Sequence, residues 1–274
     1  MNQPTDHACA TTQLVPVHIM GRDLVIECLW IAPEKTSSDL IIFLHEGLGS
    51  ASMWKDWPAQ LCEATGCRGL VFSRYGYGNS TPRPADEKWP VDFMHDQARE
   101  ALPALFAALG LEHERPILFG HSDGGSISLL FAAMYPDRVK AIAVAAPHIF
   151  VEDVTISNIQ DARQAYLATD LPQKLGRYHQ DVDSAFWGWN DIWLNPAFRA
   201  WNIEPYLDQI TCPILAIQGE DDEYGTLEQV YGIERLASQT QLCIIADCRH
   251  SPHRDQPTAV IQAVTAFIDG LDGS

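Results

Sequence analysis

The sequence predicts an α/β fold, in which a mostly parallel, eight-stranded sheet is flanked by helices and carries an inserted helical cap. Short apolar runs alternate with helical segments along most of the chain, which is typical of βαβ units. This alternation stops after Pro147 and resumes only at Cys212. The chain has 274 residues, of which 46% are hydrophobic, and this is enough to bury one large core.

The first two strands are expected to be antiparallel. Residues 1–11 are mostly polar and are expected to form a flexible N-terminus. Residues 14–19 and 24–31 are β-rich runs on either side of Met20-Gly21-Arg22-Asp23, which favours a hairpin. Six more apolar runs complete the predicted sheet: residues 40–44, 69–73, 117–119, 141–145, 214–218 and 242–246.

Helical periodicity is clearest at two places. Apolar residues recur with helical spacing from Leu102 to Leu109, and Gly110 is placed to end that helix. The last helix is expected after Pro257, with Ile261 and Val264 on one face. Both helices are predicted to pack on the sheet.

Residues 148–207 interrupt the pattern and are predicted to form the cap, leaving 12–147 and 208–274 as the core. A stretch of this length is too long for a plain connection within a compact domain. It contains four of the eight tryptophans, and disordered segments are poor in aromatic residues. We therefore expect a folded helical insertion: its tryptophans are Trp187, Trp189, Trp193 and Trp201.

Charge and cysteine content exclude several classes of function. Lys and Arg total 18 against 36 Asp and Glu, and the resulting net charge of −18 repels nucleic acid and anionic membrane surfaces. The seven cysteines show no CxxC pair and are expected to be small buried thiols. No secretory signal pattern or long apolar run is present, so we expect a soluble cytoplasmic protein that binds neither nucleic acid nor membranes.

The strongest chemical motif is Gly120-His121-Ser122-Asp123-Gly124, which follows a buried strand and precedes a helical pattern over residues 126–134. This is the strand-turn-helix context of a nucleophile elbow, in which glycines let strand and helix approach closely and the serine hydroxyl is exposed. The alternative is a chance match in a surface turn. The context favours Ser122 as a nucleophile.

With this elbow, the chain resembles the α/β-hydrolase superfamily over nearly its whole length. Leu44-His45-Glu46-Gly47-Leu48-Gly49-Ser50 is similar to the oxyanion loop of that family, with Glu46 where glycine is usual. Residues 73–80 resemble a structural turn of the family. The resemblance implies that the backbone N–H groups of Gly47 and Asp123 form the oxyanion hole.

The resemblance also implies the two partners of the serine. Gly219-Glu220-Asp221-Asp222 follows a predicted strand, and Asp222 matches the acid of the family best, with Asp221 as the alternative. After the last strand, Arg249-His250-Ser251-Pro252-His253 resembles the ending that carries the histidine base. His250 is the expected base, and His253 is expected to be structural. A carboxylate would fix the tautomer of the imidazole that activates the serine.

We expect hydrolysis of a small or medium carboxylic ester through an acyl-serine intermediate. Thioester, lactone or C–C bond hydrolysis on the same triad remains open, as does a receptor that binds a small ligand without catalysis. No metal-ligand spacing or phosphate loop is present, so neither a metal nor a cofactor is expected. The oligomeric state is not predicted. The residues expected to bind the acyl substrate are Glu46, Leu48, His148, Trp187 and Trp189.

Ser122-Asp123-Gly124-Gly125 also bears a weaker resemblance to amino-acid ester hydrolases of the valacyclovirase type. That resemblance implies that Asp123 holds a substrate ammonium group, with Glu46 close by. The alternative is that Asp123 satisfies backbone donors at the start of the helix, where a carboxylate is stabilised in any case. The sequence leaves both possibilities open.

Overall fold

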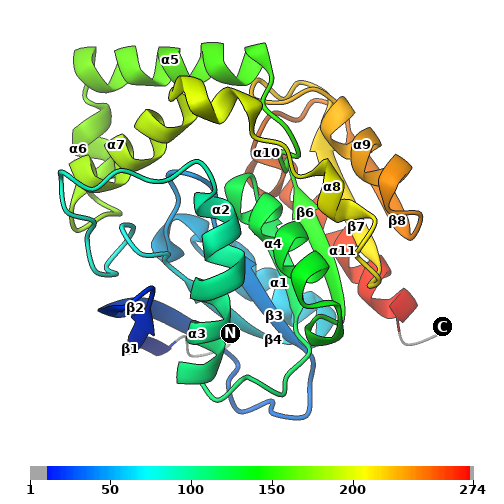
Figure 1. The fold of residues 1–274 in the computed structure, drawn as a ribbon. Helices are drawn as coiled ribbons and strands as arrows, with labels where there is room; N and C mark the ends of the chain where they lie inside the picture. The colour runs from blue at the N-terminus through cyan, green and yellow to red at the C-terminus, as the bar shows by residue number, and fades with distance from the viewer. Residues whose placement is uncertain (1–10, 272–274) are drawn as a thin grey trace, which may run out of the picture.

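The computed structural model describes residues 11–271 and contains one eight-stranded sheet in the order β1-β2-β4-β3-β5-β6-β7-β8 (Figure 1). β1 pairs with β2 and β2 with β4 in antiparallel fashion, and all other neighbours are parallel. The predicted α/β fold class is confirmed. The strands are β1 (Thr11–Ile19), β2 (Arg22–Ile31), β3 (Leu40–Leu44), β4 (Arg68–Phe72), β5 (Ile117–His121), β6 (Ala141–Ala145), β7 (Ile214–Gly219) and β8 (Thr240–Ile245).

The predicted hairpin is confirmed and is tighter than expected. Ile19 pairs with Arg22, so only Met20 and Gly21 form the turn, with φ values of 52° and 77°. Two successive positive φ values match the right-handed twist of the paired strands. Thr11 already belongs to β1 although the N-terminus was expected to be flexible through residue 11, and residues 1–10 of that prediction lie outside the described residues.

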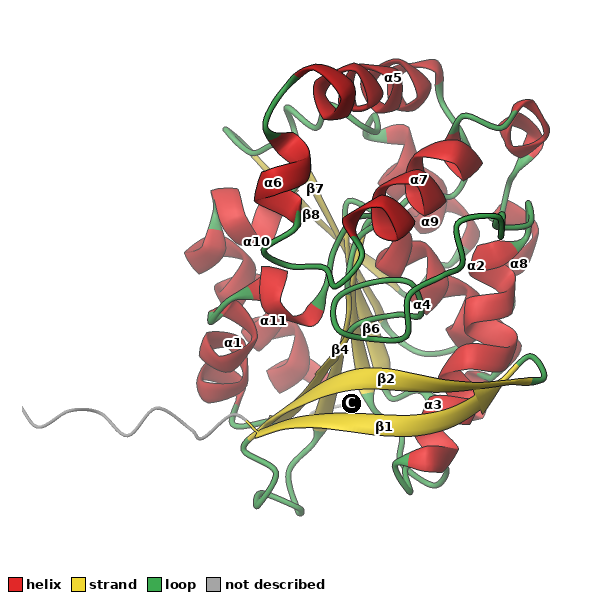
Figure 2. Cartoon of the chain, turned by 90° about the vertical axis from the view of Figure 1, so that its left-hand side faces the viewer, coloured by secondary structure: helices red, strands yellow, loops and turns green. Residues whose placement is uncertain are grey.

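Helices cover both faces of the sheet. Figure 2 shows α1, α10 and α11 on one face and α3, α4, α8 and α9 on the other. Each face has its own apolar core, because parallel strands point apolar side chains to both sides. The core helices are α1 (Trp57–Thr65), α2 (Phe93–Asp96), α3 (Leu102–Ala108), α4 (Asp123–Met134), α9 (Glu228–Leu236), α10 (Pro252–Asp255) and α11 (Pro257–Leu271), with short helical turns η1 (Ala51–Trp54), η2 (Gln97–Ala101) and η3 (Pro136–Arg138).

The helix predicted around Leu102 is longer than its apolar periodicity indicated and contains a π-helical turn, η2, between α2 and α3. Pro103 lies just after this turn and has no N–H group, so the carbonyl of Arg99 loses its helical donor. The hydroxyl of Tyr135 donates to that carbonyl instead, at 3.0 Å. The irregularity therefore has a local cause in the proline.

Between β6 and β7 the chain forms a helical segment over the carboxyl ends of the strands, where Figures 1 and 2 show α5, α6 and α7. His179 joins this segment to the core, since its Nδ1 accepts from the Gly78 N–H and its Nε2 donates to the Leu48 carbonyl, both at 3.0 Å. Ser184 accepts from the backbone N–H of Arg83 at 2.9 Å. The elements are α5 (Asp153–Ala168), α6 (Leu171–Leu175), α7 (Val182–Trp193), η4 (Pro196–Ala200) and α8 (Glu204–Leu207), the last of which packs on α4 and α9.

None of the helices within residues 11–271 combines the length and the apolarity that a membrane crossing requires. The cysteines in this part of the chain are buried, except for Cys243, which is partly exposed. Burial raises the pKa of the Cys28 thiol to about 12. Cys9 lies outside the described residues.

The turn between β5 and α4 brings backbone segments into close contact. A Cβ atom on Gly124 would lie 2.1 Å from the carbonyl oxygen of Leu44 in β3, and one on Gly120 would lie 2.3 Å from the Gly124 carbonyl oxygen. Only glycine fits at these two positions. Ser122, between them, has φ 51° and ψ −120°, a conformation that costs a non-glycine residue free energy.

We predict that Gly124→Ala lowers the free energy of unfolding by about 2 to 3 kcal/mol, because the added methyl group forces α4 away from β3. Urea denaturation measures the difference. Gly270→Ala in α11 is the matched control, since a Cβ at that position meets no atom within 4 Å. Equal losses in the two variants would contradict the role of close packing at the elbow.

Candidate active site

Three side chains that are far apart in the sequence form a continuous chain of contacts. The Oγ of Ser122 lies 3.0 Å from the Nε2 of His250, and the Nδ1 of His250 lies 2.8 Å and 3.0 Å from the two carboxylate oxygens of Asp222. These are the three residues predicted from the sequence as nucleophile, base and acid. The geometry is that of a serine activated by an imidazole whose tautomer is fixed by a carboxylate.

The sheet topology explains why these residues meet. Ser122 follows β5, Asp222 follows β7, and His250 comes after β8. These strands are parallel neighbours through β6, so their carboxyl ends lie at the same edge of the sheet. Ligand sites of open α/β sheets occur at this edge.

Asp222 is held by its own loop. Its Oδ1 accepts from the backbone N–H groups of Tyr224 at 2.8 Å and Gly225 at 3.3 Å, and its Oδ2 accepts from the amide of Gln218 at 2.7 Å. Burial alone would raise the pKa of Asp222, but His250 and the Tyr224 N–H outweigh it and lower the pKa below its ordinary value. Asp221, the alternative acid, is exposed and does not contact His250.

His250 is the base that this carboxylate orients. Burial alone would lower its pKa, but the charge of Asp222 and its hydrogen bond, together with Glu223, raise the pKa above the ordinary histidine value. The backbone N–H of His250 also donates to Glu223 at 3.1 Å. The imidazolium form, which a serine hydrolase needs during acyl transfer, is therefore favoured at this position.

The two residues predicted to supply oxyanion N–H groups, Gly47 and Asp123, line the same cavity as Ser122. Asp123 is the first residue of α4, where N–H groups have no partner within the helix. Gly47, which follows β3, lines the same cavity as Ser122. A Cβ on Gly47 would lie 2.1 Å from the Trp189 ring, so glycine is required here for the cap to pack on the loop.

The side chain of Asp123 already has partners. Trp193 in the cap donates from its Nε1 to Oδ1 of Asp123 at 3.2 Å, and Nη2 of Arg74 lies 3.9 Å from Oδ2. Burial raises the pKa of this carboxyl, and Arg74 acts in the opposite direction. The partners of Asp123 are therefore side chains and not the backbone donors at the start of α4, and its Oδ2 is buried without a hydrogen-bond partner among the described residues.

A cavity of about 130 Å³ opens beside Ser122. Of the residues predicted to bind substrate, Glu46, Leu48, His148 and Trp189 line it. Burial and the neighbouring His250 lower the pKa of His148 to about 3, so this imidazole is neutral in the cavity. The lining also includes residues that the sequence analysis did not identify: Thr155, Ile159, Trp193 and Tyr224.

The structure does not bring Trp187, the fifth residue predicted to bind substrate, to this cavity. Its ring lies outside this cavity, packs against Tyr166 and Phe186, and has the guanidinium of Arg163 at 5.2 Å. Trp187 and Trp189 are two positions apart on α7, and each residue turns the helix by about 100°, so their side chains point to nearly opposite sides. Trp193, four positions after Trp189, shares its face, and this spacing was visible in the sequence.

The remaining histidines near the site have structural partners. His253 is buried, with its ring 4.6 Å from that of Trp54 and 5.4 Å from that of Trp57. His45 donates from Nδ1 to the Glu46 carbonyl at 2.7 Å and accepts at Nε2 from the Arg74 N–H at 3.0 Å. Within residues 11–271, no group of three or more His, Cys, Asp or Glu side chains is arranged to hold a metal ion.

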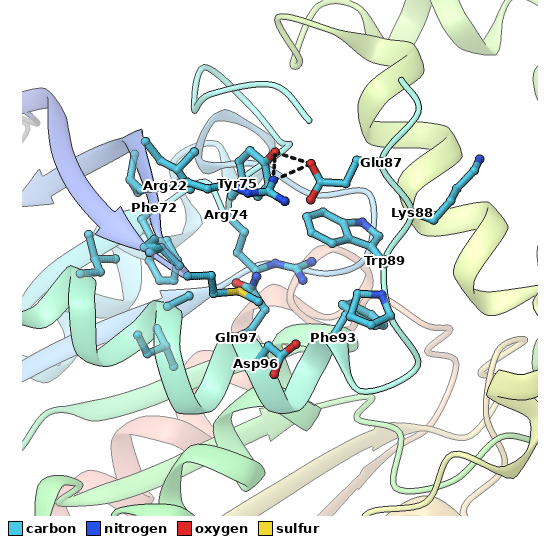
Figure 3. Close-up of a pocket in the computed structure, with 18 residues that line it drawn as sticks. Arg22, Phe72, Arg74, Tyr75, Glu87, Lys88, Trp89, Phe93, Asp96 and Gln97 are labelled. Carbon is cyan, nitrogen blue, oxygen red and sulfur yellow. Dashed lines mark hydrogen bonds and ion pairs between the residues drawn. The ribbon is translucent and has the colours of Figure 1, made fainter. Parts of the chain in front are cut away.

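A second cavity, of about 210 Å³, lies between the β1–β2 hairpin and the helices α2 and α3 (Figure 3). At one side of it Arg22, Tyr75 and Glu87 are joined by mutual hydrogen bonds of 2.7 to 3.1 Å. The described residues that line it include no serine, cysteine or histidine. This second cavity therefore lacks the groups for acyl transfer that meet in the cavity beside Ser122.

Known proteins similar to this chain are hydrolases. The sn-1-specific diacylglycerol lipase ABHD11 of Mus musculus is 24% identical over 263 residues, which cover 83% of this chain and 80% of that protein. The serine hydrolase BPHL of Homo sapiens is 25% identical over 194 residues, 67% of this chain and 63% of that protein. The structure of a thermophilic esterase from Thermogutta terrifontis superposes with a TM-score of 0.70 at 19% identity, covering 95% of this chain and 99% of that one, and shares the fold.

A match to the alpha/beta hydrolase family extends over most of the chain, from β3 to α11. It includes the oxyanion loop, the elbow and the loops that carry Asp222 and His250. Since the match covers residues 41–263, this chain belongs to the alpha/beta hydrolase family.

Proposed function

We propose that this hydrolase cleaves a carboxylic ester of a small, uncharged acid through an acyl-serine intermediate. The observation that carries the proposal is the unbroken contact from Ser122 through His250 to Asp222, at a strained elbow beside two backbone N–H groups. The names of two similar proteins, a diacylglycerol lipase and an esterase, are those of enzymes that act on esters.

The reaction follows from these positions. The Oγ of Ser122 attacks the ester carbonyl carbon while Nε2 of His250 takes the hydroxyl proton, and the Gly47 and Asp123 N–H groups donate to the oxygen that becomes negative. When the C–O bond breaks, His250 returns the proton to the leaving alcohol. Water then attacks the acyl-serine by the same steps, releasing the acid and restoring Ser122.

The cavity supports a small and uncharged acyl group. Its volume of about 130 Å³ is below the usual range for ligand pockets, about 300 to 1,000 Å³. Glu46 and Asp123 line it, whereas no lysine or arginine does among the described residues. The lack of a lysine or arginine among these lining residues, together with the net charge of −18, disfavours anionic substrates.

Other scissile bonds are the main alternatives, because fold and triad do not fix the bond that is cleaved. A panel of p-nitrophenyl esters, acyl thioesters and lactones distinguishes them when rates are compared with those of the Ser122→Ala variant. A receptor without catalytic activity is the alternative from a different class. Covalent labelling of Ser122 by a fluorophosphonate probe supports the enzyme, whereas folded protein that does not react favours the receptor.

We predict that Ser122→Ala lowers kcat on the preferred ester by about 10⁴-fold or more, because His250 is left with no hydroxyl to activate. His250→Ala is expected to cause a similar loss. His253→Ala should lose much less, since His253 packs against Trp54 and Trp57 away from Ser122. Steady-state kinetics measures all three variants, and a Ser122→Ala enzyme with a tenth of the wild-type rate would refute the assignment.

The dependence of kcat/KM on pH in the acidic range tests the assignment of His250 as the base. His250 must be neutral to accept the serine proton, and its pKa is raised by Asp222. We therefore predict that kcat/KM rises with pH through a limb centred above about 6.5, the ordinary histidine value. Chelators should have no effect on this profile, and a loss in EDTA that a divalent cation restores would contradict the metal-free mechanism.

Trp189 is predicted to set acyl-chain preference. Its ring lines the cavity, so Trp189→Ala should raise kcat/KM for long acyl esters relative to short ones by about tenfold, which corresponds to a few lost apolar contacts. Trp187→Ala is the matched control on the same helix, outside the cavity. A series of p-nitrophenyl esters measures the ratio, and an equal change in both variants would mean that these tryptophans act only through cap packing.

A further inference from the structure

Two ionisable side chains outside the triad, Glu46 and His121, meet beside the catalytic histidine. The Nε2 of His121 lies 2.7 Å from the backbone carbonyl oxygen of His250, and its Nδ1 lies 3.4 Å from Oε2 of Glu46. His121 is 1% exposed, and Glu46 lines the cavity that contains Ser122. The pair therefore lies between the loop that positions His250 and the oxyanion loop.

Hydrogen-bond chemistry fixes one proton on His121. A carbonyl oxygen only accepts, so Nε2 donates to His250 and carries a hydrogen. In a neutral imidazole Nδ1 is then an acceptor, and it faces a carboxylate oxygen, which also accepts. Nδ1 is fully buried. Among the described residues, no hydrogen-bond partner lies within 3.5 Å of it in a suitable geometry. A neutral His121 would leave this buried contact repulsive.

One additional proton makes the contact attractive. Burial alone would raise the pKa of the Glu46 carboxyl, but His121 outweighs it and lowers the pKa well below the ordinary value. The carboxylate form of Glu46 is therefore favoured, and a proton on the facing Nδ1 of His121 would make the contact an attractive ion pair. In this arrangement Nε2 of His121 donates to the His250 carbonyl, and Nδ1 faces the Glu46 carboxylate at ion-pair distance.

We propose that Glu46 and His121 form a proton-holding pair that positions His250 and keeps the oxyanion side of the cavity free of net charge. Glu46 immediately precedes Gly47, so an uncompensated carboxylate there would repel the oxyanion of the transition state. The cationic His121 cancels this charge and strengthens its own hydrogen bond to the His250 carbonyl. The proposal rests on the proposed serine-hydrolase function, and both are positioning residues for that reaction.

The other charged groups around the pair do not replace His121. His45 and His253 act on Glu46 from the oxyanion loop and α10, and burial holds the pKa values of both well below the ordinary range, so they are neutral. Arg74, after β4, donates to the backbone carbonyl of Glu46 and faces Asp123 of the elbow. Among the described residues, the ion pair that Glu46 makes is with His121.

Loss of the shared proton has a defined effect. Without a proton on Nδ1 of His121, the Glu46 carboxylate is no longer compensated, and it faces a lone pair of that nitrogen. Both changes act against the reaction, since one repels the oxyanion and the other loosens the contact that holds the His250 loop. The wild-type kcat/KM is therefore expected to fall reversibly at alkaline pH, giving a bell-shaped profile.

The pH profile of Glu46→Gln tests the pair. A glutamine amide donates to Nδ1 of a neutral His121 and carries no charge, so this variant should lose the alkaline limb and keep the acidic one. His253→Gln, a buried neighbour of His121 with no carboxylate contact, should keep both limbs. An alkaline limb that is the same in Glu46→Gln and wild type would overturn the proposal. If the glutamine variant does not fold, Glu46→Gly takes its place with the same expected loss.

A second measurement does not depend on catalysis. Nuclear magnetic resonance of ¹⁵N-labelled imidazoles should show His121 protonated on both nitrogens in the wild type at neutral pH and on Nε2 alone in Glu46→Gln. A singly protonated His121 in the wild type would overturn the proposal even if the protein hydrolyses esters. Two protons on His121 in a protein without hydrolase activity would support the pair and remove the proposed function.

Discussion

The site depends on the backbone contact between the elbow and strand β3. Because Gly124 touches the Leu44 carbonyl and Gly120 touches the Gly124 carbonyl, the chain has room to turn from β5 into α4 only through a strained residue. That residue is Ser122, whose positive φ costs about 1 to 3 kcal/mol in typical cases. The same turn brings the hydroxyl towards His250 and starts α4 at Asp123, so the proposed nucleophile and one proposed oxyanion donor are positioned by one packing constraint.

The cap contributes to this arrangement as well as covering it. Trp193 donates to the carboxylate of Asp123, and Trp189 packs directly on Gly47. His179 uses both ring nitrogens to join the Gly78 turn to the oxyanion loop at Leu48. Each of these side chains contacts a residue in or next to the predicted oxyanion hole. The predicted cap, the helical segment between β6 and β7, is therefore part of what orients the proposed acyl site.

Much of the fold and of the candidate site could be predicted from the sequence, because the patterns that indicate them are local. A strand, a turn with two glycines and a helix are adjacent in the chain around Ser122, and the loops with Asp222 and His250 each follow an apolar run. Trp187 was misplaced because the number of aromatic residues indicates a folded cap but not which face of its helix points inward. The spacing of Trp189 and Trp193 carried that information.

Other features depend on contacts that no local pattern encodes. Tyr224 reaches the cavity through the loop that also holds Asp222, and Arg74 approaches Asp123 from a different strand. Glu46 was noticed as a departure from the glycine usual in the family, but its partner His121 becomes apparent only when β3 and β5 lie side by side. The charge state of residues such as Glu46 depends on which side chains lie close to them in the fold. A single sequence does not contain that information.

The contact between Trp189 and Gly47 links two properties that a designer would want to vary separately. The indole lines the proposed acyl cavity and also packs as an apolar surface on Gly47, a proposed oxyanion donor. Shortening this side chain enlarges the cavity and also admits water to the Gly47 amide, where a wetter surrounding weakens each hydrogen bond to the developing charge. A broader substrate range and an intact rate enhancement therefore make opposite demands on this one side chain. A variant that accepts larger substrates needs another apolar group to exclude water from the loop.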